Sequence, residues 1–337
     1  MKTAEHSGIW ILAEQHDGAV QRISFELLTR ARQLADKRDA PLTAVIFGHQ
    51  VEEEGLQALI RCGADRVIAV EATELSHFLL EPYARCFRKL IEEDKPEIII
   101  AGATTTGRTL MPYLAVQVHA GLTADCTVLD IEKDTGNLLQ TRPAIGGNIL
   151  ATIKTPSHRP QMATVRPHST KPAEPDDGRT GSVERREAPT DLLTSRMKRI
   201  DFQPDTEQQG LQEADHVVTV GRGIKKADNI PLAQQLAHHL NAALGASRDV
   251  IDRGWLSYPH QIGLSGKTVT PRLYVGLGVS GAIQHLAGMQ TAETIVAINS
   301  DLDAQIFKVA DFGIVGDLFE IVPAINEKMQ HRRTSSS

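Results

Sequence analysis

The sequence has few cysteines and few aromatic residues. Its 337 residues include only 4% aromatics and three cysteines, Cys62, Cys86 and Cys126. The cysteines are odd in number, far apart and without CxxC spacing, so they indicate reduced thiols rather than a disulfide framework or a zinc site. We therefore expect no bound metal and a reducing compartment such as the cytoplasm.

Long apolar runs and an excess of positive charge are also missing. No stretch approaches the ~18 apolar residues of a transmembrane helix, and Glu14 interrupts the short apolar run near the N-terminus, so we expect neither membrane insertion nor a targeting segment. The net charge of −6 makes nucleic acid an improbable partner. A hydrophobic content of 41% over this length is enough for two globular domains.

The first half alternates short apolar runs with amphipathic segments. This βαβα order predicts a parallel sheet covered on both faces. We expect strands at 9–13, 42–47, 66–70, 97–101 and 161–166, helices at 24–37, 53–62, 81–94 and 110–119, and a strand that begins at 125–127 and continues at 145–153. Gly102 to Arg108 forms a small-residue loop at a strand end. Thr104 to Thr106 in it could approach a ligand or simply cap the next helix.

The composition changes between His168 and Asp191, where proline, glycine and charged residues dominate. The segment is either a linker or an edge strand within a long connection. We expect an N-terminal domain over 1–190 that ends in a polar linker, a second domain over 200–330, and a disordered tail at 331–337.

The second half contains a strand, a glycine turn, a helix and a second parallel strand between Arg272 and Asp301. Gly276, Gly278 and Gly281 surround the turn, and Gln284 and His285 lie in the first turn of the expected helix. Unpaired N–H groups and the helix dipole at such a helix start favour phosphate. The turn does not match GxGxxG, because Ala282 and Ile283 follow Gly281.

Further loops follow other expected strands of this half and would meet at one edge of a doubly wound sheet, as a nucleotide site. They are 221–223 after the strand 216–220, 245–248 after a helix at 230–244, 261–267, and the start at Asp317 of a helix to 328 after the strand 312–315. Arg222 between two glycines suits a phosphate, since its guanidinium offers parallel donors.

Each candidate side chain has a structural alternative. Arg248 could be a surface ion-pair partner, and His285 could point to water. Ser265 and Lys267 also fit an ordinary turn, and Asp317 fits a helix cap.

Taken in their order along the chain, several sequence motifs resemble those of the α subunit of electron transfer flavoprotein. The matching segments are GATTTGRTLMPYLA, GLTADCT and RPAIGGNILATI in the first half, and GRG, GASRDVID, QIGLSGKTV, LYVGLGVSGAIQHLAG, IVAINSD and IFKVADFGIVGDLFEIVP in the second. The resemblance implies an α/β fold of two doubly wound parallel-sheet domains, the C-terminal one Rossmann-like and binding one FAD. It also implies a heterodimer with a β subunit.

The resemblance further implies the cofactor residues. Those expected to line the flavin, ribityl chain and pyrophosphate are Arg222, Ser247, Gln261, Ile262, Gly263, Leu264, Ser265, Ser280, Gly281, Ala282, Ile283, Gln284 and His285, and those at the adenosine end are Asn299, Asp317 and Leu318. Arg248 would lie against the isoalloxazine, and a partly positive His285 would lie near its N1/O2 edge. Both would tune the redox potential by stabilising negative charge on the reduced flavin.

The implied function is that of an electron carrier rather than an enzyme with its own organic substrate. A dehydrogenase, of the acyl-CoA type of fatty acid oxidation or linked to NADH, would supply electrons, and a quinone oxidoreductase or another acceptor would receive them. Val220 and the Leu264-Ser265 pair differ from the residues that are usual at these positions in the family. The LSGK form looks more like the branches of nitrogen fixation, carnitine metabolism or electron bifurcation. An NAD(P)-dependent dehydrogenase and a non-redox nucleotide-binding module are the alternatives, and the first lacks its GxGxxG fingerprint.

Overall fold

A computed structural model describes residues 6–143, 150–201, 211–212 and 214–334. The chain divides into two compact units. The described residues of the first lie between 6 and 201, and those of the second between 211 and 334. Each unit is built on its own parallel sheet.

The first unit contains a seven-stranded sheet in which every neighbouring pair is parallel. The strands, in sheet order, are β12 (Ser182–Glu187), β5 (Arg66–Glu71), β4 (Leu42–Gly48), β1 (Ile9–Ala13), β6 (Ile98–Gly102), β11 (Gln161–Val165) and β7 (Gly121–Cys126). The chain proceeds from β1 to β4 and β5 on one side and then crosses to β6 on the other. The topological switch point therefore lies between β1 and β6.

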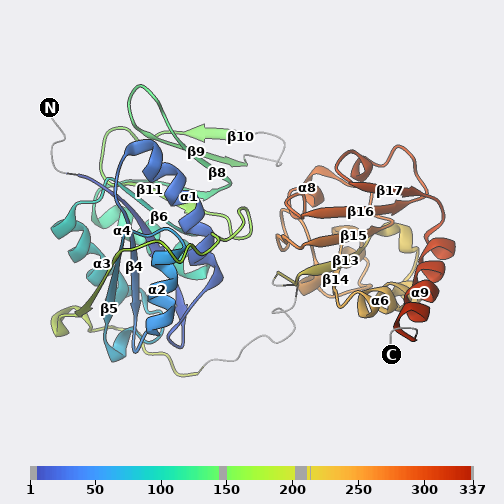
Figure 1. The fold of residues 1–337 in the computed structure, drawn as a ribbon, viewed down its shortest axis with the longest axis horizontal. Coiled ribbons are helices and arrows are strands. Elements are labelled where there is room, and N and C mark those ends of the chain that lie inside the picture. The colour runs from blue at the N-terminus through green and yellow to red at the C-terminus, as the bar shows by residue number, and fades with distance from the viewer. Residues whose placement is uncertain (1–5, 144–149, 202–210, 213, 335–337) are drawn as a thin grey trace. The chain divides into compact units, whose positions relative to one another are not determined.

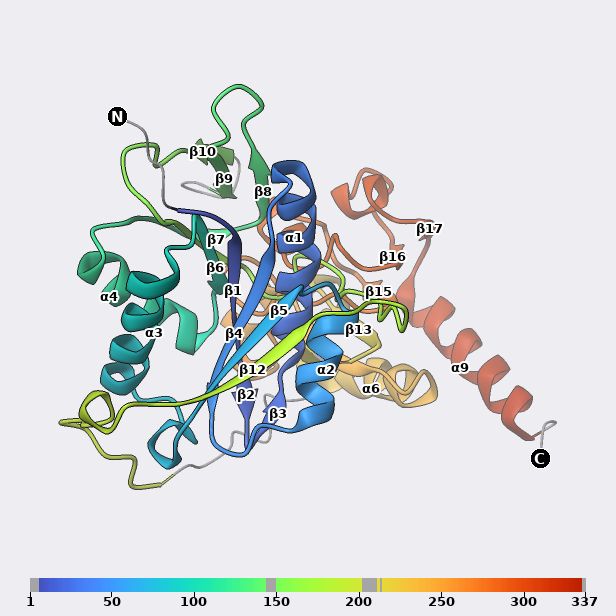
Figure 2. The ribbon, with the colours of Figure 1, turned by 60° about the vertical axis from the view of Figure 1, so that its left-hand side comes forward.

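Helices cover both faces of this sheet, as the alternating pattern predicted (Figures 1 and 2). They are α1 (Arg22–Arg38) and α2 (Glu53–Arg61) on one face, and α3 (Leu80–Asp94) and α4 (Thr105–Gln117) on the other. Leu27 and Leu56 are buried in the core under the first pair, and Phe87 and Leu110 in the core under the second. Burial on both faces explains why β1, β4 and β6 are apolar throughout.

Several strands outside the main βαβα pattern differ from those predicted, and one of them decides between two alternatives left open by the sequence. The charged segment before Asp191 contains an edge strand, β12, parallel to β5, so the edge-strand alternative is the correct one. The strand expected to begin at 125–127 begins earlier, as β7 at Gly121, because Thr123 and Asp125 interrupt its apolar pattern. A separate antiparallel sheet was not expected; it consists of β8 (Val128–Ile131), β9 (Leu138–Pro143) and β10 (Leu150–Ile153), of which β10 lies within the strand expected at 145–153. A small hairpin pairs β2 (Gln15–His16) with β3 (Ala19–Val20). Of the strand expected at 145–153, residues 145–149 lie outside the described residues.

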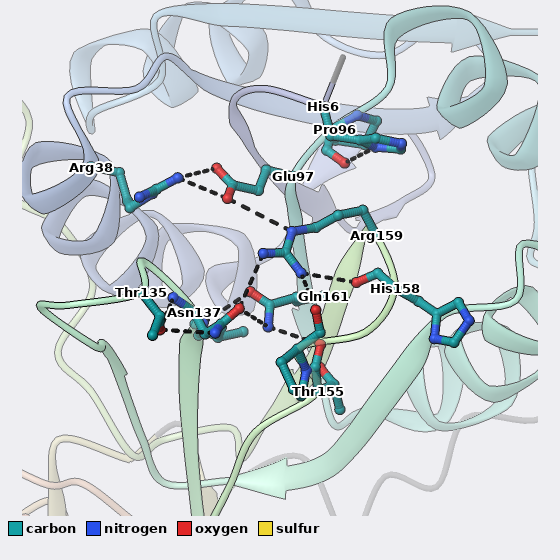
Figure 3. A network of polar contacts seen from close by, with 12 residues as sticks. His6, Arg38, Pro96, Glu97, Thr135, Asn137, Thr155, His158, Arg159 and Gln161 are labelled. Atoms are coloured by element: carbon teal, nitrogen blue, oxygen red, sulfur yellow. Dashed lines mark hydrogen bonds and ion pairs between the residues drawn. The ribbon is translucent and has the colours of Figure 1, made fainter. Parts of the chain in front are cut away.

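A polar network fastens the antiparallel sheet to the start of β11 (Figure 3). Buried Gln161 accepts a hydrogen bond from the Leu138 N–H at 2.9 Å and donates to the Thr155 carbonyl at 3.0 Å. Beside it, Arg38 donates to both carboxylate oxygens of Glu97 at 2.8 Å. These hydrogen bonds satisfy polar groups that would be destabilising if they were buried without partners. We therefore assign the network a structural role.

The second unit has five parallel strands. In sheet order they are β14 (Ala243–Ala246), β13 (His216–Val220), β15 (Leu273–Leu277), β16 (Thr294–Asn299) and β17 (Phe312–Val315). This unit also contains the helices α6 (Ile230–His239), α7 (Arg248–Asp252), α8 (Ile283–Leu286) and α9 (Leu318–Thr334). The chain reverses direction across the sheet between β13 and β15, which is its topological switch point.

The two faces of this second sheet are covered differently. Helices α6 and α9 pack on one face, over the core that contains Leu236 and Val322. The other face is closed mainly by loops and short turns, over a core that contains Tyr274 and Ile306. The carboxyl ends of β13 and β15 therefore lie next to loops, which can form a binding site.

Three expected helices have different lengths in the structure. The helix expected at 230–244 ends at His239, because Asn241 adopts a left-handed conformation (φ 49°) and 243–246 form β14. The helix expected after Gly281 is only the four-residue α8, so its dipole is small. Helix α9 continues to Thr334, past the expected end of the domain, and residues 335–337 of the expected tail lie outside the described residues. Among the described helices, none combines the length and apolar character needed to cross a membrane.

Candidate cofactor site

A cavity of about 820 Å³ lies at the carboxyl ends of the strands of the second sheet. Its walls come from the loops after β13, β14, β15 and β16 and from the turn 261–265, so it sits at the switch point. The lining residues are Arg222, Gly223, Ser247, Arg248, Asp249, Asp252, Gln261, Ile262, Gly263, Leu264, Ser265, Gly278, Val279, Ser280, Ala282, Gln284, His285, Asn299 and Asp301. This is the position at which doubly wound sheets bind nucleotides.

Two glycine loops touch backbone to backbone beside the cavity. The Gly223 N–H donates to the Gly278 carbonyl at 3.1 Å. A Cβ on Gly278 would lie 2.6 Å from the Gly223 Cα, and Gly278 has a φ of 61°. Both the close approach and the positive φ therefore require glycine at 278. Asn299 adds a side-chain link, because its Nδ2 donates to the Val279 carbonyl at 2.8 Å.

The turn from Gln261 to Ser265 presents a hydroxyl at the cavity wall. Buried Gln261 donates from Nε2 to the Ser265 Oγ at 3.0 Å. The Leu264 N–H donates to the Gln284 carbonyl at 2.7 Å, which ties this turn to α8. Since Ser265 Oγ already accepts a hydrogen bond, its own O–H remains available as a donor.

Two arginines lie at the cavity from neighbouring strand ends. Arg222 follows β13 and pairs with Asp249 at 3.5 Å, while Arg248 begins α7 and pairs with Asp252 at 3.3 Å. Their side chains are 69% and 71% exposed, so their guanidinium groups keep most of their solvation. The surface ion pair considered for Arg248 is present, and Arg248 lines the cavity as well.

His285 is buried at the cavity wall and does not point to water. Only 6% of it is exposed, and its Nε2 lies 2.7 Å from the Tyr274 hydroxyl. Burial lowers the pKa of His285 to about 4, an effect that the Ile262 backbone only partly offsets. This lowered pKa favours a neutral ring and so does not support the expected partial positive charge. Its Nδ1 meets hydrogen-bonding geometry with no group in the described part of the chain, although the Ile262 backbone lies near the ring.

All but four of the sequence-predicted site residues line this one cavity. The exceptions are Gly281, Ile283, Asp317 and Leu318. Gly281 packs on the Ile306 backbone, and the Ile283 side chain is exposed. Asp317 accepts from the Phe319 N–H at 2.9 Å, the helix-cap role considered for it, and Leu318 is buried in the core under α6 and α9.

Sequence reasoning missed other residues at or behind the cavity. Asp249, Asp252 and Asp301 line it, and their proximity to arginines or to a strand end was the only available signal. Tyr274 was read merely as part of a strand. Nothing in the local sequence shows that its ring reaches His285.

The loop after β6 in the first unit adopts the capping alternative. Thr104 Oγ1 accepts from the Gly107 N–H at 3.1 Å, and the Thr104 hydroxyl donates to Glu14 Oε1 at 2.6 Å. Burial raises the pKa of Glu14 to about 7 although this hydrogen bond opposes the shift. Thr105 and Thr106 line a smaller cavity of about 430 Å³ at the switch point of that unit.

The second unit thus has the fold and site of a domain that binds a dinucleotide-type cofactor. The glycine loops allow close approach of a pyrophosphate, the arginines suit its charge, and the unpartnered Nδ1 of His285 suits a carbonyl of a flavin ring. These residues fit FAD. No cluster of His, Cys, Asp and Glu able to hold a metal occurs in the described ranges.

Comparisons with known proteins agree with this class. The family model "Electron transfer flavoprotein domain" matches residues 9–191, and "Electron transfer flavoprotein FAD-binding domain" matches residues 210–290. The chain therefore belongs to the electron transfer flavoprotein family, as an α-subunit-type member with FAD as its cofactor.

Three curated relatives illustrate the similarity. The electron transfer flavoprotein subunit alpha of Thermoanaerobacterium thermosaccharolyticum is 47% identical, over 97% of this chain and 98% of its own. The acryloyl-CoA reductase electron transfer subunit beta of Anaerotignum propionicum is 41% identical, over 97% and 96%. The lactate dehydrogenase (NAD(+),ferredoxin) subunit LctC of Acetobacterium woodii is 39% identical, over 95% and 76%.

Proposed function

We propose that this chain is the FAD-holding α subunit of a heterodimer with an electron transfer flavoprotein β subunit. In this role it passes electrons from a dehydrogenase, of the acyl-CoA type or linked to NADH, to a quinone oxidoreductase or another acceptor. The observation that carries the proposal is the convergence of the predicted residues on one cavity at the switch point of an FAD-binding domain. Residues from four strand ends and a turn line this cavity together, as a shared ligand requires.

The phosphate end of the cofactor would be held chiefly by the loops after β13 and β15. Gly223 and Gly278 bring the two backbones together without side chains between them. Arg222 contributes positive charge at the mouth, and the hydroxyls of Ser247 and Ser280 are further donors in the lining. Asn299, held by the Val279 carbonyl, supports the loop from the neighbouring strand.

The redox end would be tuned by three side chains. Bound FAD supplies the electron-accepting ring. Ser265, oriented by Gln261, offers an O–H donor, and neutral His285 offers one ring N–H. Arg248 contributes a full positive charge, which favours added electrons on a neighbouring ring.

A second candidate function is a subunit of an electron-bifurcating flavoprotein complex. The sequence Leu264-Ser265-Gly266-Lys267 favours this branch. The relative LctC is named a lactate dehydrogenase (NAD(+),ferredoxin) subunit, and this name also supports the bifurcating candidate. The two candidates differ in the number and properties of the flavins that the heterodimer carries.

The test is a flavin count followed by a stepwise reductive titration of the chain co-purified with its β subunit. One FAD per heterodimer, reduced by a dehydrogenase and reoxidised by a quinone reductase, would support the simple carrier. Two FADs, one of them reduced directly by NADH, would support bifurcation. A heterodimer that takes up no FAD would overturn both.

A further inference from the structure

His285 is held from behind by a tyrosine that does not reach the cavity. The Tyr274 hydroxyl lies 2.7 Å from His285 Nε2, and the two rings meet edge to face with centroids 6.2 Å apart. Tyr274 is fully buried on β15, whereas His285 lines the cavity from α8. The contact therefore joins the core of the sheet to the cofactor site.

Gly276 makes this contact sterically possible. A Cβ on Gly276 would lie 3.2 Å from the Tyr274 Cε1 and 2.9 Å from the Ile306 side chain. Residues 274 and 276 face the same side of β15, because side chains alternate along a strand. A side chain at 276 would press on the tyrosine ring, so glycine leaves space for it to lie toward His285.

The protons of this pair can be assigned from burial and hydrogen-bonding capacity. Burial raises the pKa of Tyr274 and lowers that of His285 to about 4, so at neutral pH the phenol keeps its proton and the imidazole carries only one. A buried O–H without an acceptor is destabilising, because it has lost its hydrogen bonds to water. The acceptor within hydrogen-bond distance of the phenol is His285 Nε2. Thr219 Oγ1 also lies near the phenol and lowers its pKa, but it falls outside hydrogen-bonding geometry, so His285 Nε2 is the better acceptor.

If Nε2 accepts from the phenol, the single imidazole proton lies on Nδ1. Nδ1 is buried, and the Ile262 backbone lies near the ring, but no group of the described residues meets hydrogen-bonding geometry with Nδ1. An N–H in that position requires an acceptor, and the neighbouring cavity is where a cofactor would provide one.

We propose that Tyr274 is a positioning residue that fixes His285 as the Nδ1–H tautomer and so presents one neutral N–H donor to a carbonyl oxygen of the flavin. The inference rests on the proposed function, because the flavin supplies the acceptor. It makes His285 a hydrogen-bond donor of fixed direction rather than a source of charge, which leaves Arg248 as the cation of the redox end.

The first experiment measures the tautomer in wild-type protein by ¹⁵N NMR after ¹⁵N-histidine labelling. The His285 signals are assigned by their loss in His285→Gln. We expect a protonated Nδ1 and an unprotonated, hydrogen-bonded Nε2 across neutral pH, both in FAD-depleted protein and in the FAD-loaded heterodimer. A protonated Nε2, or a doubly protonated ring, would overturn the proposal, and this measurement depends on no tyrosine variant.

The second experiment compares Tyr274→Phe with Tyr83→Phe. Tyr83 is a matched control, because it is also buried and donates its hydroxyl to the Leu75 carbonyl at 2.9 Å, in the first unit. In Tyr274→Phe we expect loss of the single-tautomer pattern and a more negative potential of bound FAD. Tyr83→Phe should keep both wild-type values even if it lowers stability.

The outcomes also separate this inference from the proposed function. Wild-type protein that binds no FAD would refute the function, while the tautomer of the FAD-depleted chain would still test the Tyr274–His285 contact. Wild-type protein that binds FAD, with Tyr274→Phe unchanged in tautomer and in potential, would refute the positioning role alone.

Discussion

Gln261 donates a hydrogen bond from Nε2 to the Oγ of Ser265, 3.0 Å away across a single turn. Gln261 is buried, whereas Ser265 lies at the cavity wall. The amide therefore occupies an acceptor position of the hydroxyl and leaves its hydrogen free for the cofactor. A short local contact thus sets the direction of a donor at the redox end.

Ser265→Ala is expected to make the potential of bound FAD more negative. Loss of one hydrogen bond is worth about 1 kcal/mol, which for a one-electron couple is roughly 40 mV, given that 59 mV is a tenfold change. Spectroelectrochemical titration of the heterodimer would measure the shift. Ser257→Ala is the control, because Ser257 lies in the same region, contacts His260 and does not line the cavity. Equal potentials for the two variants would contradict the role of Ser265.

Arg248→Ala is also expected to lower the potential of bound FAD, by tens of millivolts. A cation favours electrons on a nearby ring, but the exposure of this side chain weakens the effect. The fold should be retained, since the ion pair of Arg248 with Asp252 is a surface contact between two exposed side chains. Redox titration and thermal unfolding would measure the two effects.

The control for that variant is Arg253→Ala. Arg253 lies over the Trp255 ring, 5.4 Å from its centroid, and does not line the cavity. The Arg253→Ala substitution removes the same charge from the same region of the chain as Arg248→Ala does. An unchanged potential in Arg248→Ala, or an equal shift in both variants, would argue against a specific contact with the flavin.

Gly278→Ala is expected to destabilise the second unit by about 3 kcal/mol or more and to weaken FAD binding. The added Cβ would meet the Gly223 Cα at 2.6 Å. Gly254→Ala is the matched control, because Gly254 has a φ of 70° but nothing within 4 Å of its Cβ position. The control should cost only the left-handed strain, about 1 kcal/mol. Urea denaturation and FAD titration would measure both, and equal losses would refute the steric explanation.

Glu14→Gln is expected to flatten part of the pH dependence of stability of the first unit. The folded-state pKa of Glu14 is raised from 4.5 to about 7, so its stabilising contribution is complete below pH 4.5 and is lost as the pH rises through 7. Above that range the wild type holds a buried carboxylate at a cost of about 3 kcal/mol, which glutamine avoids. Urea denaturation at several pH values should give a variant more stable than wild type above pH 7. No gain there would contradict the assignment.

The local sequence was sufficient for much of the fold, for reasons visible in single elements. Strands β1, β13 and β17 have the predicted bounds, because each is an apolar run closed by turn or polar residues. The glycine loops after β13 and β15 could be assigned to a ligand, because a doubly wound sheet brings the carboxyl ends of its strands to one edge. Asp317 as a helix cap was likewise a local possibility that the structure bears out.

Other features depended on contacts between residues distant in sequence. Residues 243–246 continue a helical pattern, yet they form β14 because β13 offers its edge for pairing. The lowered pKa of His285 follows from its burial, and the Tyr274 ring reaches it from a strand, beside space that Gly276 leaves by lacking a side chain. Residue types and spacing therefore determined where a cofactor would bind, whereas the tertiary structure decided which groups at that site carry charge, because desolvation and hydrogen bonding arise only when the chain has folded.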